Sequence, residues 1–390
     1  MRIALVLLAV NALVFWALWV RVSAASPGHR KRARIILAVA YWLPLLPTLL
    51  MPFKADALRV FRSDAPLWLS VPSMAFQFAV LCYGIWLVLF SFPLFTALKV
   101  RRRLGKDEVD ETRRDLLKRA ALAPPAAIIV ASGIGAVGAM ADPVIRKVML
   151  KTPPDMTNLH GLRIAQFSDV HIGRFVKTDH LRELVAMVNA QDADIVVCTG
   201  DLLDHAMEQL EDAQMMLRGV KHRHGVFMCL GNHEYYAAGQ KLDQLIAGVE
   251  ATGAVMLRDD SRKVSVGGDH FWMLGVDYPG RRQPKDSFDH ALKEVADDGA
   301  PRIVLAHNPS SFYEGRERQI DLQLSGHTHG GQVTLGRIGQ VEFSPVLPFE
   351  FYHAGEYEHE GRKLYVNSGT GQWMPVRLNC PPEITLIEMV

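Results

Sequence analysis

Cysteine is scarce in this chain, which has four cysteines in 390 residues and no CxxC pair. The lack of a thiolate cluster argues against a structural zinc site. Cys198 and Cys229 lie inside apolar runs typical of strands, so we expect buried free thiols rather than disulfides. Internal repeats and low-complexity tracts are also missing, and charge is nearly balanced at +2.

Charged residues are missing from the middle of the first three of four apolar blocks, which argues against ion transport. The blocks cover residues 3–20, 35–53, 67–98 and 120–141. Each is near or above the length that crosses a bilayer as a helix, so residues 1–148 are predicted to form a helical transmembrane region of about four helices. The alternative, buried helices of a soluble protein, is disfavoured because these runs lack a water-facing side.

Acidic residues are absent from the basic segment 21–34, and residues 99–119 carry nine lysines and arginines. The positive-inside rule makes both segments cytoplasmic. We therefore expect a multi-pass protein of the cytoplasmic (inner) membrane, with everything after residue 141 on the periplasmic or extracytoplasmic side.

Residues 112–118, Thr-Arg-Arg-Asp-Leu-Leu-Lys, resemble a bacterial twin-arginine export signal and predict the same side. The alternative is an ordinary basic flank of a membrane helix. Ala139-Met140-Ala141 also fits a small-residue cleavage site, so both a tethered and a released downstream domain remain open.

From about residue 152 the pattern changes to short apolar runs alternating with amphipathic helices, which predicts an α/β domain. One helix face is marked by Leu181, Leu184, Val185 and Val188. Buried strands are predicted at 162–167, 195–198, 226–230, 271–276, 303–306 and 320–324.

Polar side chains follow five of these strands, and each group alone is typical of a turn or a surface histidine. The groups are Asp169-Val170-His171, Gly200-Asp201-Leu202-Leu203-Asp204, Gly231-Asn232-His233-Glu234, His307-Asn308-Pro309 and Gly326-His327-Thr328-His329-Gly330-Gly331-Gln332. Because ligands of open α/β sheets gather at the carboxyl ends of strands, we expect all five groups to meet at one edge.

This set of motifs resembles the calcineurin-like metallophosphoesterases over residues 156–390, and the membrane part is not included. The HTHGGQ motif at 327–332, with YVNSG at 365–369 and NCPPE at 379–383, is similar to the bacterial membrane-anchored or twin-arginine-exported branch. The resemblance implies an α/β fold with two facing mixed β-sheets flanked by helices, over a domain of residues 152–390.

The resemblance also implies a binuclear metal centre. One ion would be bound by Asp169, His171 and His329, the other by Asn232, His307 and His327, and Asp201 would bridge the two. Oxygen and imidazole ligands suit Mn, Fe or Zn. Such a pair lowers the pKa of a shared water, and the resulting hydroxide attacks phosphorus in line.

Three further residues have roles implied by the resemblance. His233 would protonate the leaving oxygen. Glu234 would orient His233 by a hydrogen bond, although many relatives carry Asp there, and Asp204 would support the ligands from behind. For Glu234 and Asp204 the alternative is a capping or turn residue.

The expected activity is hydrolysis of a phosphomonoester or phosphodiester at the outer membrane face, with a lipid-linked phosphate among the candidate substrates and membrane lipid as a partner. Arg281 and Arg282 would grip a second phosphate or form an ordinary solvated pair. Residues 335–360 would be an insertion that roofs the site. The other predicted rim residues are His205, Tyr235, Tyr236 and Tyr278.

Two alternatives come from other functional classes. A membrane sensor or scaffold with an idle phosphoesterase domain predicts a missing ligand, and none is missing. A nucleic-acid enzyme predicts a basic groove and a cytoplasmic domain. The domain carries many acids and is predicted outside, so we expect no nucleic acid partner.

Overall fold

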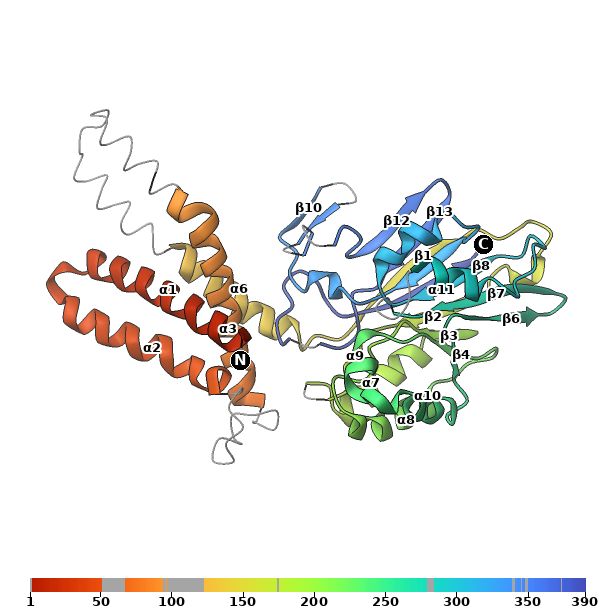
Figure 1. Ribbon diagram of the computed structural model, residues 1–390, viewed down its shortest axis with the longest axis horizontal. Coiled ribbons are helices and arrows are strands. Elements are labelled where there is room, and N and C mark those ends of the chain that lie inside the picture. Colours follow the sequence, from red (N-terminus) through yellow and green to blue (C-terminus); the bar gives the residue numbers. More distant parts are fainter. Residues whose placement is uncertain are drawn as a thin grey trace. The chain divides into compact units, whose positions relative to one another are not determined.

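A computed structural model describes most of the chain, which divides into two compact units (Figure 1). The helical unit is Met1–Val137 with Met374–Val376, and the α/β unit is Gly138–Trp373 with Arg377–Val390. The described residues are 2–50, 67–93, 96, 123–173, 175–278, 284–338, 341–344, 346–347, 350–372 and 374–390. The twin-arginine-like motif, the whole second basic segment, and Arg281 and Arg282 lie outside these ranges.

The helical unit is held together by an apolar core and by buried polar contacts. Its helices are α1 (Arg2–Ala25), α2 (Arg30–Leu50), α3 (Leu67–Trp86), which continues as a π-helical turn over Leu87–Ser91, and α6 (Ala123–Gly138). Asn11 of α1 donates to Gln77 of α3 at 3.2 Å, and the Tyr41 hydroxyl of α2 donates to the Asn11 carbonyl at 3.1 Å. Such hydrogen bonds between apolar helices help to fix which helices associate.

Two stretches of the described residues, rather than four, are long and apolar enough to cross a bilayer. They are Leu8–Ala25 and Ser70–Ser91. The fourth predicted span is shorter than expected, because α6 has 16 residues and therefore rises about 24 Å, against about 30 Å of hydrocarbon. The second predicted span, 35–53, ends outside the described residues.

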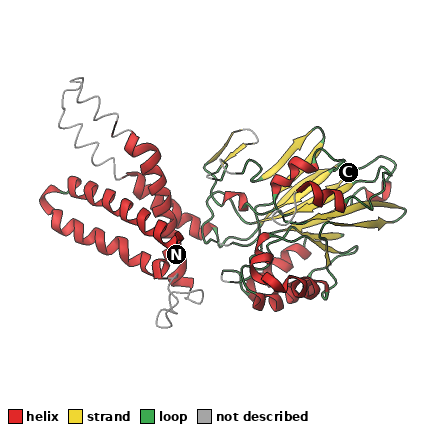
Figure 2. Ribbon diagram, in the orientation of Figure 1, coloured by secondary structure: helices red, strands yellow, loops and turns green. Residues whose placement is uncertain are grey.

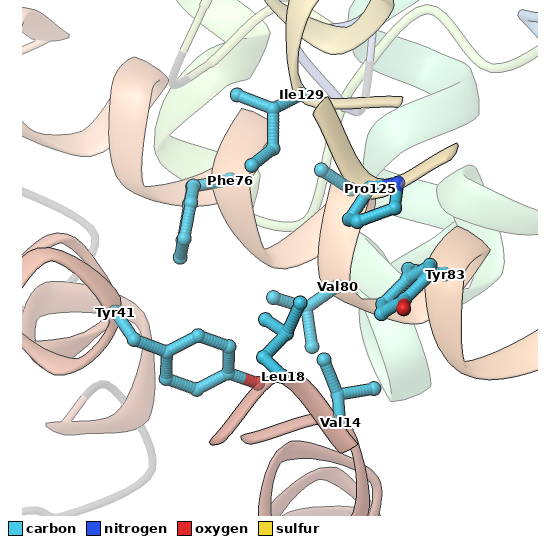
Figure 3. Close-up of a pocket in the computed structure, with 9 residues that line it drawn as sticks. Val14, Leu18, Tyr41, Phe76, Val80, Tyr83, Pro125 and Ile129 are labelled. Carbon is cyan, nitrogen blue, oxygen red and sulfur yellow. The ribbon is translucent and has the colours of Figure 1, made fainter. Parts of the chain in front are cut away.

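A small apolar cavity of about 20 Å³ lies among α1, α2, α3 and α6. Figure 3 shows Tyr41 and Tyr83 on opposite sides of it, with Pro125 and Ile129 of α6 beside it. Its apolar lining and its size, about that of one water molecule, make it a packing defect rather than a substrate site.

The α/β unit contains two six-stranded mixed sheets and one short hairpin. The first sheet has the order β1 (Val144–Leu150), β14 (Glu383–Met389), β2 (Arg163–Phe167), β3 (Ile195–Cys198), β4 (Val226–Met228), β5 (Val255–Met256). The second has the order β12 (Gly355–His359), β13 (Arg362–Val366), β9 (Leu322–Ser325), β8 (Arg302–Ala306), β7 (Asp269–Val276), β6 (Asp260–Val266). The hairpin is β10 (Gly336–Ile338) with β11 (Val341–Phe343).

Each sheet is mixed because a parallel centre carries antiparallel strands. Strands β2 to β5 are parallel, whereas β14 runs antiparallel to β2. Strands β7, β8, β9 and β13 are parallel, whereas β6 and β12 run antiparallel to their neighbours. All six predicted strands are present, and the expectation of two mixed sheets flanked by helices is confirmed.

Three layers of apolar side chains hold the α/β unit together. Residues of both sheets, including Ile164 and Ile303, form the core between the sheets. Helices α7 (Thr178–Asn189), α8 (Leu210–Gly219) and α10 (Leu242–Glu250) cover the outer face of the first sheet, and α11 (Pro284–Ala291) covers the second (Figure 2). Leu181, Leu184 and Val188 of α7 are buried, as the predicted helix face requires. Burial of such a side chain contributes roughly 1.5–3 kcal/mol.

Strand β1 is an element that the sequence analysis missed. It pairs in parallel with β14, Val144 opposite Glu383 and Leu150 opposite Met389, and it precedes the predicted domain start at residue 152. Its burial alternates only at its end, and Arg146 and Lys147 are exposed, so no strand period is visible in the sequence.

Candidate metal centre

The five polar groups predicted from the sequence meet where strands of both sheets end. Asp169 and His171 follow β2, Asp201 and Asp204 follow β3, and Asn232 opens α9 (Asn232–Ala238) after β4. His307 follows β8 of the second sheet, and the two remaining histidines, His327 and His329, follow β9. Six of the seven predicted ligands are at most 8% exposed, and His327 is half-buried.

Their ligand atoms form overlapping groups that could hold metal ions. Three sets have all their ligand atoms within 4.8 Å of one another, namely Asp169/His171/His329, His171/Asp201/His233 and Asp201/His307/His327. The Asp201 carboxylate is 3.8 Å from Nε2 of His171 and 3.2 Å from Nε2 of His307. Asp201 therefore lies between the two predicted ligand sets, where a bridging carboxylate belongs.

The backbone is strained at this centre. Ten described non-glycine residues have positive φ, and five of them are predicted ligands, with φ between 50° and 72°: Asp169, His171, Asp201, His327 and His329. Such residues cost about 1–3 kcal/mol each and persist where the surrounding packing overdetermines them, commonly at functional sites.

Two glycines let the loops approach each other closely. A Cβ at Gly326 would lie 2.1 Å from the Ser168 hydroxyl and 2.2 Å from an Asp169 oxygen. A Cβ at Gly231 would lie 2.1 Å from an Asp201 oxygen. Any side chain at these positions would displace a predicted ligand.

The donor set fits a pair of divalent cations. Nε2 of His171 lies 2.9 Å from Nε2 of His329, which is itself 3.4 Å from an Asp169 oxygen. Nδ1 of His327 is buried and has no hydrogen-bond partner. Lone pairs of imidazoles and carboxylates thus converge in a small buried volume, and oxygen and imidazole donors suit Mn, Fe or Zn.

The electrostatics agree with this fit. Burial would raise the pKa of Asp201, but the charges of His307 and His171 outweigh it and lower this pKa. Burial would lower the pKa of His307, but Asp201 and Asp169 raise it to about 9. Burial and His307 lower the pKa of His327 to about 4. The Asp201 carboxylate therefore attracts positive charge, whereas burial raises the pKa of Asp169. His327 presents the neutral imidazole that a metal ligand needs.

Comparison with known proteins assigns the family. The model of the calcineurin-like phosphoesterase family matches residues 162–331. A transmembrane protein with metallophosphoesterase domain from Danio rerio is 30% identical over 421 residues, covering 98% of this chain and 88% of that protein. The chain belongs to the calcineurin-like phosphoesterases.

Two bacterial phosphoesterases match a smaller part of the chain. An uncharacterized metallophosphoesterase of Helicobacter pylori strain J99 is 33% identical over 236 residues, 59% of this chain. The chain spans about 60% of the length of that protein. Phosphodiesterase YaeI of Escherichia coli strain K12 is 29% identical, over 60% of this chain and 84% of its own.

His233 is positioned beside the phosphoesterase ligands by Asp204 and Asp201. Its Nδ1 donates to the Asp204 carbonyl, and its backbone N–H donates to Asp201 at 2.8 Å. The Asp204 carboxylate lies 3.6 Å from the same Nδ1 and 3.5 Å from Nδ1 of His171. Asp204 therefore contacts a predicted ligand and the predicted acid.

The predicted hydrogen bond from Glu234 to His233 is wrong. The Glu234 carboxylate is 2% exposed and accepts four backbone N–H groups, from Asp201, Leu202, Leu203 and Gly231, at 2.7–3.1 Å. The first turn of α9 directs this side chain back under the loop after β3. Glu234 thus anchors the loop that carries Asp201, and it acts on the site through the backbone.

The predicted rim residues differ in what they contact. The Tyr236 ring lies 5.4 Å from that of His233, and the Tyr278 ring lies 5.7 Å from that of His327. The Tyr235 hydroxyl instead donates to Asp277, so it is part of a packing contact. His205 is paired with Asp204 at 2.8 Å.

Arg377 is a site residue that the sequence analysis missed. It is 2% exposed, and its Nη2 lies 3.2 Å from Nδ1 of His329. The same guanidinium donates to backbone carbonyls of Ser368, Gly369, Gly371 and Cys380. A lone arginine in a loop carries no sequence signal of such burial, so only the fold reveals it.

Proposed function

We propose that this chain is a metal-dependent phosphoester hydrolase whose seven convergent side chains hold two divalent ions. The observation that carries the proposal is the position of Asp201 between two groups of imidazole and carboxylate donors from five separate strand ends. A bound pair of ions would supply a nucleophilic water and stabilise charge on the phosphoryl group.

The chain's own residues complete the reaction. Because Nδ1 of His233 is directed at the Asp204 carbonyl, its Nε2 is the nitrogen available to give a proton to the leaving oxygen. We assign His233 the role of general acid, Asp204 the role of holding His233 and His171, and Glu234 the role of holding the loop that carries Asp201.

We further propose that the substrate is a phosphodiester or phosphomonoester at the outer face of the cytoplasmic membrane, including a lipid-linked one. The name of the Escherichia coli relative supports a diester. The name of the Danio rerio relative and the two apolar helical stretches support membrane attachment. The basic segments 21–34 and 99–119 and the twin-arginine-like motif support the outward side. On that side we expect no nucleic acid partner.

The alternative of an idle sensor domain has less support. It predicts a lost or misplaced ligand, whereas all seven predicted ligands are present and six are buried together.

The test is hydrolysis of bis-(p-nitrophenyl) phosphate and p-nitrophenyl phosphate by the detergent-purified full chain, metal-free and with added Mn²⁺, Fe²⁺ or Zn²⁺. We expect turnover that depends on metal and is abolished by Asp201→Asn. The faster substrate distinguishes diesterase from monoesterase activity. Binding of two ions without turnover of either substrate would favour a lipid substrate, and failure to bind any ion would refute the proposal.

A further inference from the structure

A line of hydrogen bonds runs behind the metal centre and ends on Asp169. The side-chain amide of Gln166 donates to the Thr199 hydroxyl at 3.0 Å, Thr199 donates to the Ser168 hydroxyl at 2.7 Å, and Ser168 donates to Oδ2 of Asp169 at 2.6 Å. All four residues are fully buried, with 0% exposure. Water therefore does not compete for these bonds.

The strand register explains why these residues meet. Phe167 of β2 pairs with Cys198 of β3, so the next residues, Ser168 and Thr199, leave the two parallel strands side by side. Gln166 stands two residues before Ser168 on β2 and faces the core between the sheets, where it also donates to the Ser325 carbonyl of the second sheet at 3.1 Å.

The direction of the line is determined at both ends. The Ser325 carbonyl only accepts, so the Gln166 group that faces it and Thr199 is the amide N–H₂. At the other end Asp169, as an ionised metal ligand, only accepts. Each hydroxyl between them must therefore donate toward Asp169, and the line has one proton arrangement.

This arrangement distinguishes the two Asp169 oxygens. The His327 N–H donates to both, at 3.0 Å to Oδ1 and 3.1 Å to Oδ2, but Ser168 donates to Oδ2 alone. Oδ1 is the oxygen that lies 3.4 Å from Nε2 of His329. Loss of the Ser168 hydroxyl would leave Oδ2 with the His327 N–H alone, and loss of the Thr199 hydroxyl would remove the donor that orients Ser168. Either loss would loosen the orientation of the Asp169 carboxylate.

The backbone of Thr199 serves the other ligand group. Its carbonyl accepts from Nδ1 of His307 at 2.6 Å. This bond places a proton on Nδ1, so Nε2, which is 3.2 Å from both Asp201 and the Asn232 side-chain oxygen, is the nitrogen that would face a cation. One residue thus contacts both predicted ligand groups, through its hydroxyl and its carbonyl separately.

We propose that Thr199 is a positioning residue for the metal centre, and that its hydroxyl orients Asp169 while its carbonyl sets the tautomer of His307. The proposal rests on the proposed function, because it assumes that these ligands bind two ions. Since the two contacts use different atoms, a side-chain substitution at Thr199 removes the first contact and keeps the second.

Two substitutions separate the hydroxyl from the shape of the side chain. Thr199→Val keeps the shape and removes the hydroxyl, whereas Thr199→Ser keeps the hydroxyl and removes a methyl group. Ser168→Ala breaks the same line at its next bond and covers the case in which Thr199→Val does not fold. The matched control is Thr252→Val, which removes a hydroxyl bonded to the Val249 carbonyl of α10.

The measurement is calorimetric titration of Mn²⁺ into the metal-free full chain in detergent, with thermal unfolding of the metal-free proteins alongside. We expect Thr199→Val and Ser168→Ala to weaken one of two Mn²⁺ binding steps by about 10- to 100-fold. The other step, Thr199→Ser and the control should match the wild type.

Any other result of the Mn²⁺ titrations would contradict a specific part of the proposal. Wild-type affinities in Thr199→Val, or equal weakening in Thr199→Ser, would overturn the role of the hydroxyl while leaving the proposed function standing. Equal weakening of both steps would refute the separation of the two contacts. A wild-type chain that binds no Mn²⁺ would overturn this inference and the proposed function together.

Discussion

His233 is held by two contacts that leave its Nε2 free. The Asp204 carbonyl accepts from Nδ1, and Asp201 accepts from the backbone N–H. A general acid in this position increases the rate most when the leaving oxygen is strongly basic and must be protonated as it leaves. Its importance should therefore depend on the leaving group.

For His233→Ala we expect kcat to fall by roughly 10²–10⁴-fold on an alkyl phosphodiester, because an alkoxide is a poor leaving group. The fall should be smaller with p-nitrophenol as the leaving group. Mn²⁺ titration should still show two ions bound, since His233 is not among the seven predicted ligands. Equal losses with both leaving groups would assign His233 to binding rather than to proton transfer.

Helix α9 and the loop after β3 are joined at the element scale by Glu234. Its two carboxylate oxygens accept four backbone N–H groups. Three belong to the loop after β3, and the fourth belongs to Gly231, which precedes α9. Hydrogen bonds to one buried carboxylate therefore hold the loop and the helix together.

Glu234→Gln should destabilise the α/β unit by roughly 2–3 kcal/mol, because an amide N–H₂ would face backbone N–H groups and leave them unpaired. Urea unfolding of the full chain, followed by near-UV circular dichroism, measures this change. Asp179→Asn is the control, since Asp179 is exposed and paired only with Arg182. Unchanged stability with an altered pH–rate profile would instead indicate a direct action of Glu234 on His233.

Strands β13 and β14 contain a buried carboxyl group outside the metal centre. Glu383 is 6% exposed and accepts from Tyr365 at 2.7 Å and from Thr385 at 3.1 Å. Burial raises the pKa of Glu383 above its ordinary value of 4.5, and these hydrogen bonds offset only part of the rise.

This raised pKa predicts a pH dependence of stability. Between pH 4.5 and the raised value, the folded chain holds a proton at Glu383 that the unfolded chain has lost. The stability contributed by the neutral carboxyl is therefore present below that window and falls as pH rises through it. Glu383→Gln does not titrate, so urea midpoints at pH 5 and pH 8 should show the wild type losing stability relative to the variant at pH 8. A gain would contradict the sign.

At the scale of the whole molecule, the proposed orientation predicts that the α/β unit lies outside the cytoplasmic membrane. Met215 of α8 is 37% exposed, and Gly28 lies exposed in the first basic segment. Cys198, Cys229 and Cys380 are buried, whereas Cys82 is half-buried and is the native thiol whose labelling the wild type must control for.

We expect Met215→Cys to react with a membrane-impermeant maleimide in spheroplasts of a bacterial host. Gly28→Cys should react only after the membrane is permeabilised, and the wild type supplies the background. The reverse pattern would refute the outward orientation and return the nucleic-acid alternative to consideration.

The sequence by itself determined the central strands and the polar groups that follow them. Apolar runs of four to six residues predicted the six central strands, and polar groups directly after them predicted which side chains meet at one edge, because strand ends and their motifs are local in the chain. The assignment of seven of these side chains as metal ligands rests on the family resemblance and stays a prediction. Strand β1 was not predicted, because Arg146 and Lys147 are both exposed and interrupt the alternation of apolar and polar residues that is typical of a strand. The prediction of about four membrane helices rested on length and apolarity, and α6 is too short to meet it.

Only the tertiary structure decided what each polar side chain contacts. Glu234 stands next to His233 in sequence yet bonds to the loop after β3, because the first turn of α9 directs it there. Arg377 lies far along the chain from His329, which it contacts, and Thr199 lies 31 residues from Ser168, to which its hydroxyl donates. Contacts between distant segments depend on strand order and on the packing of two sheets, which no local pattern in a single sequence encodes.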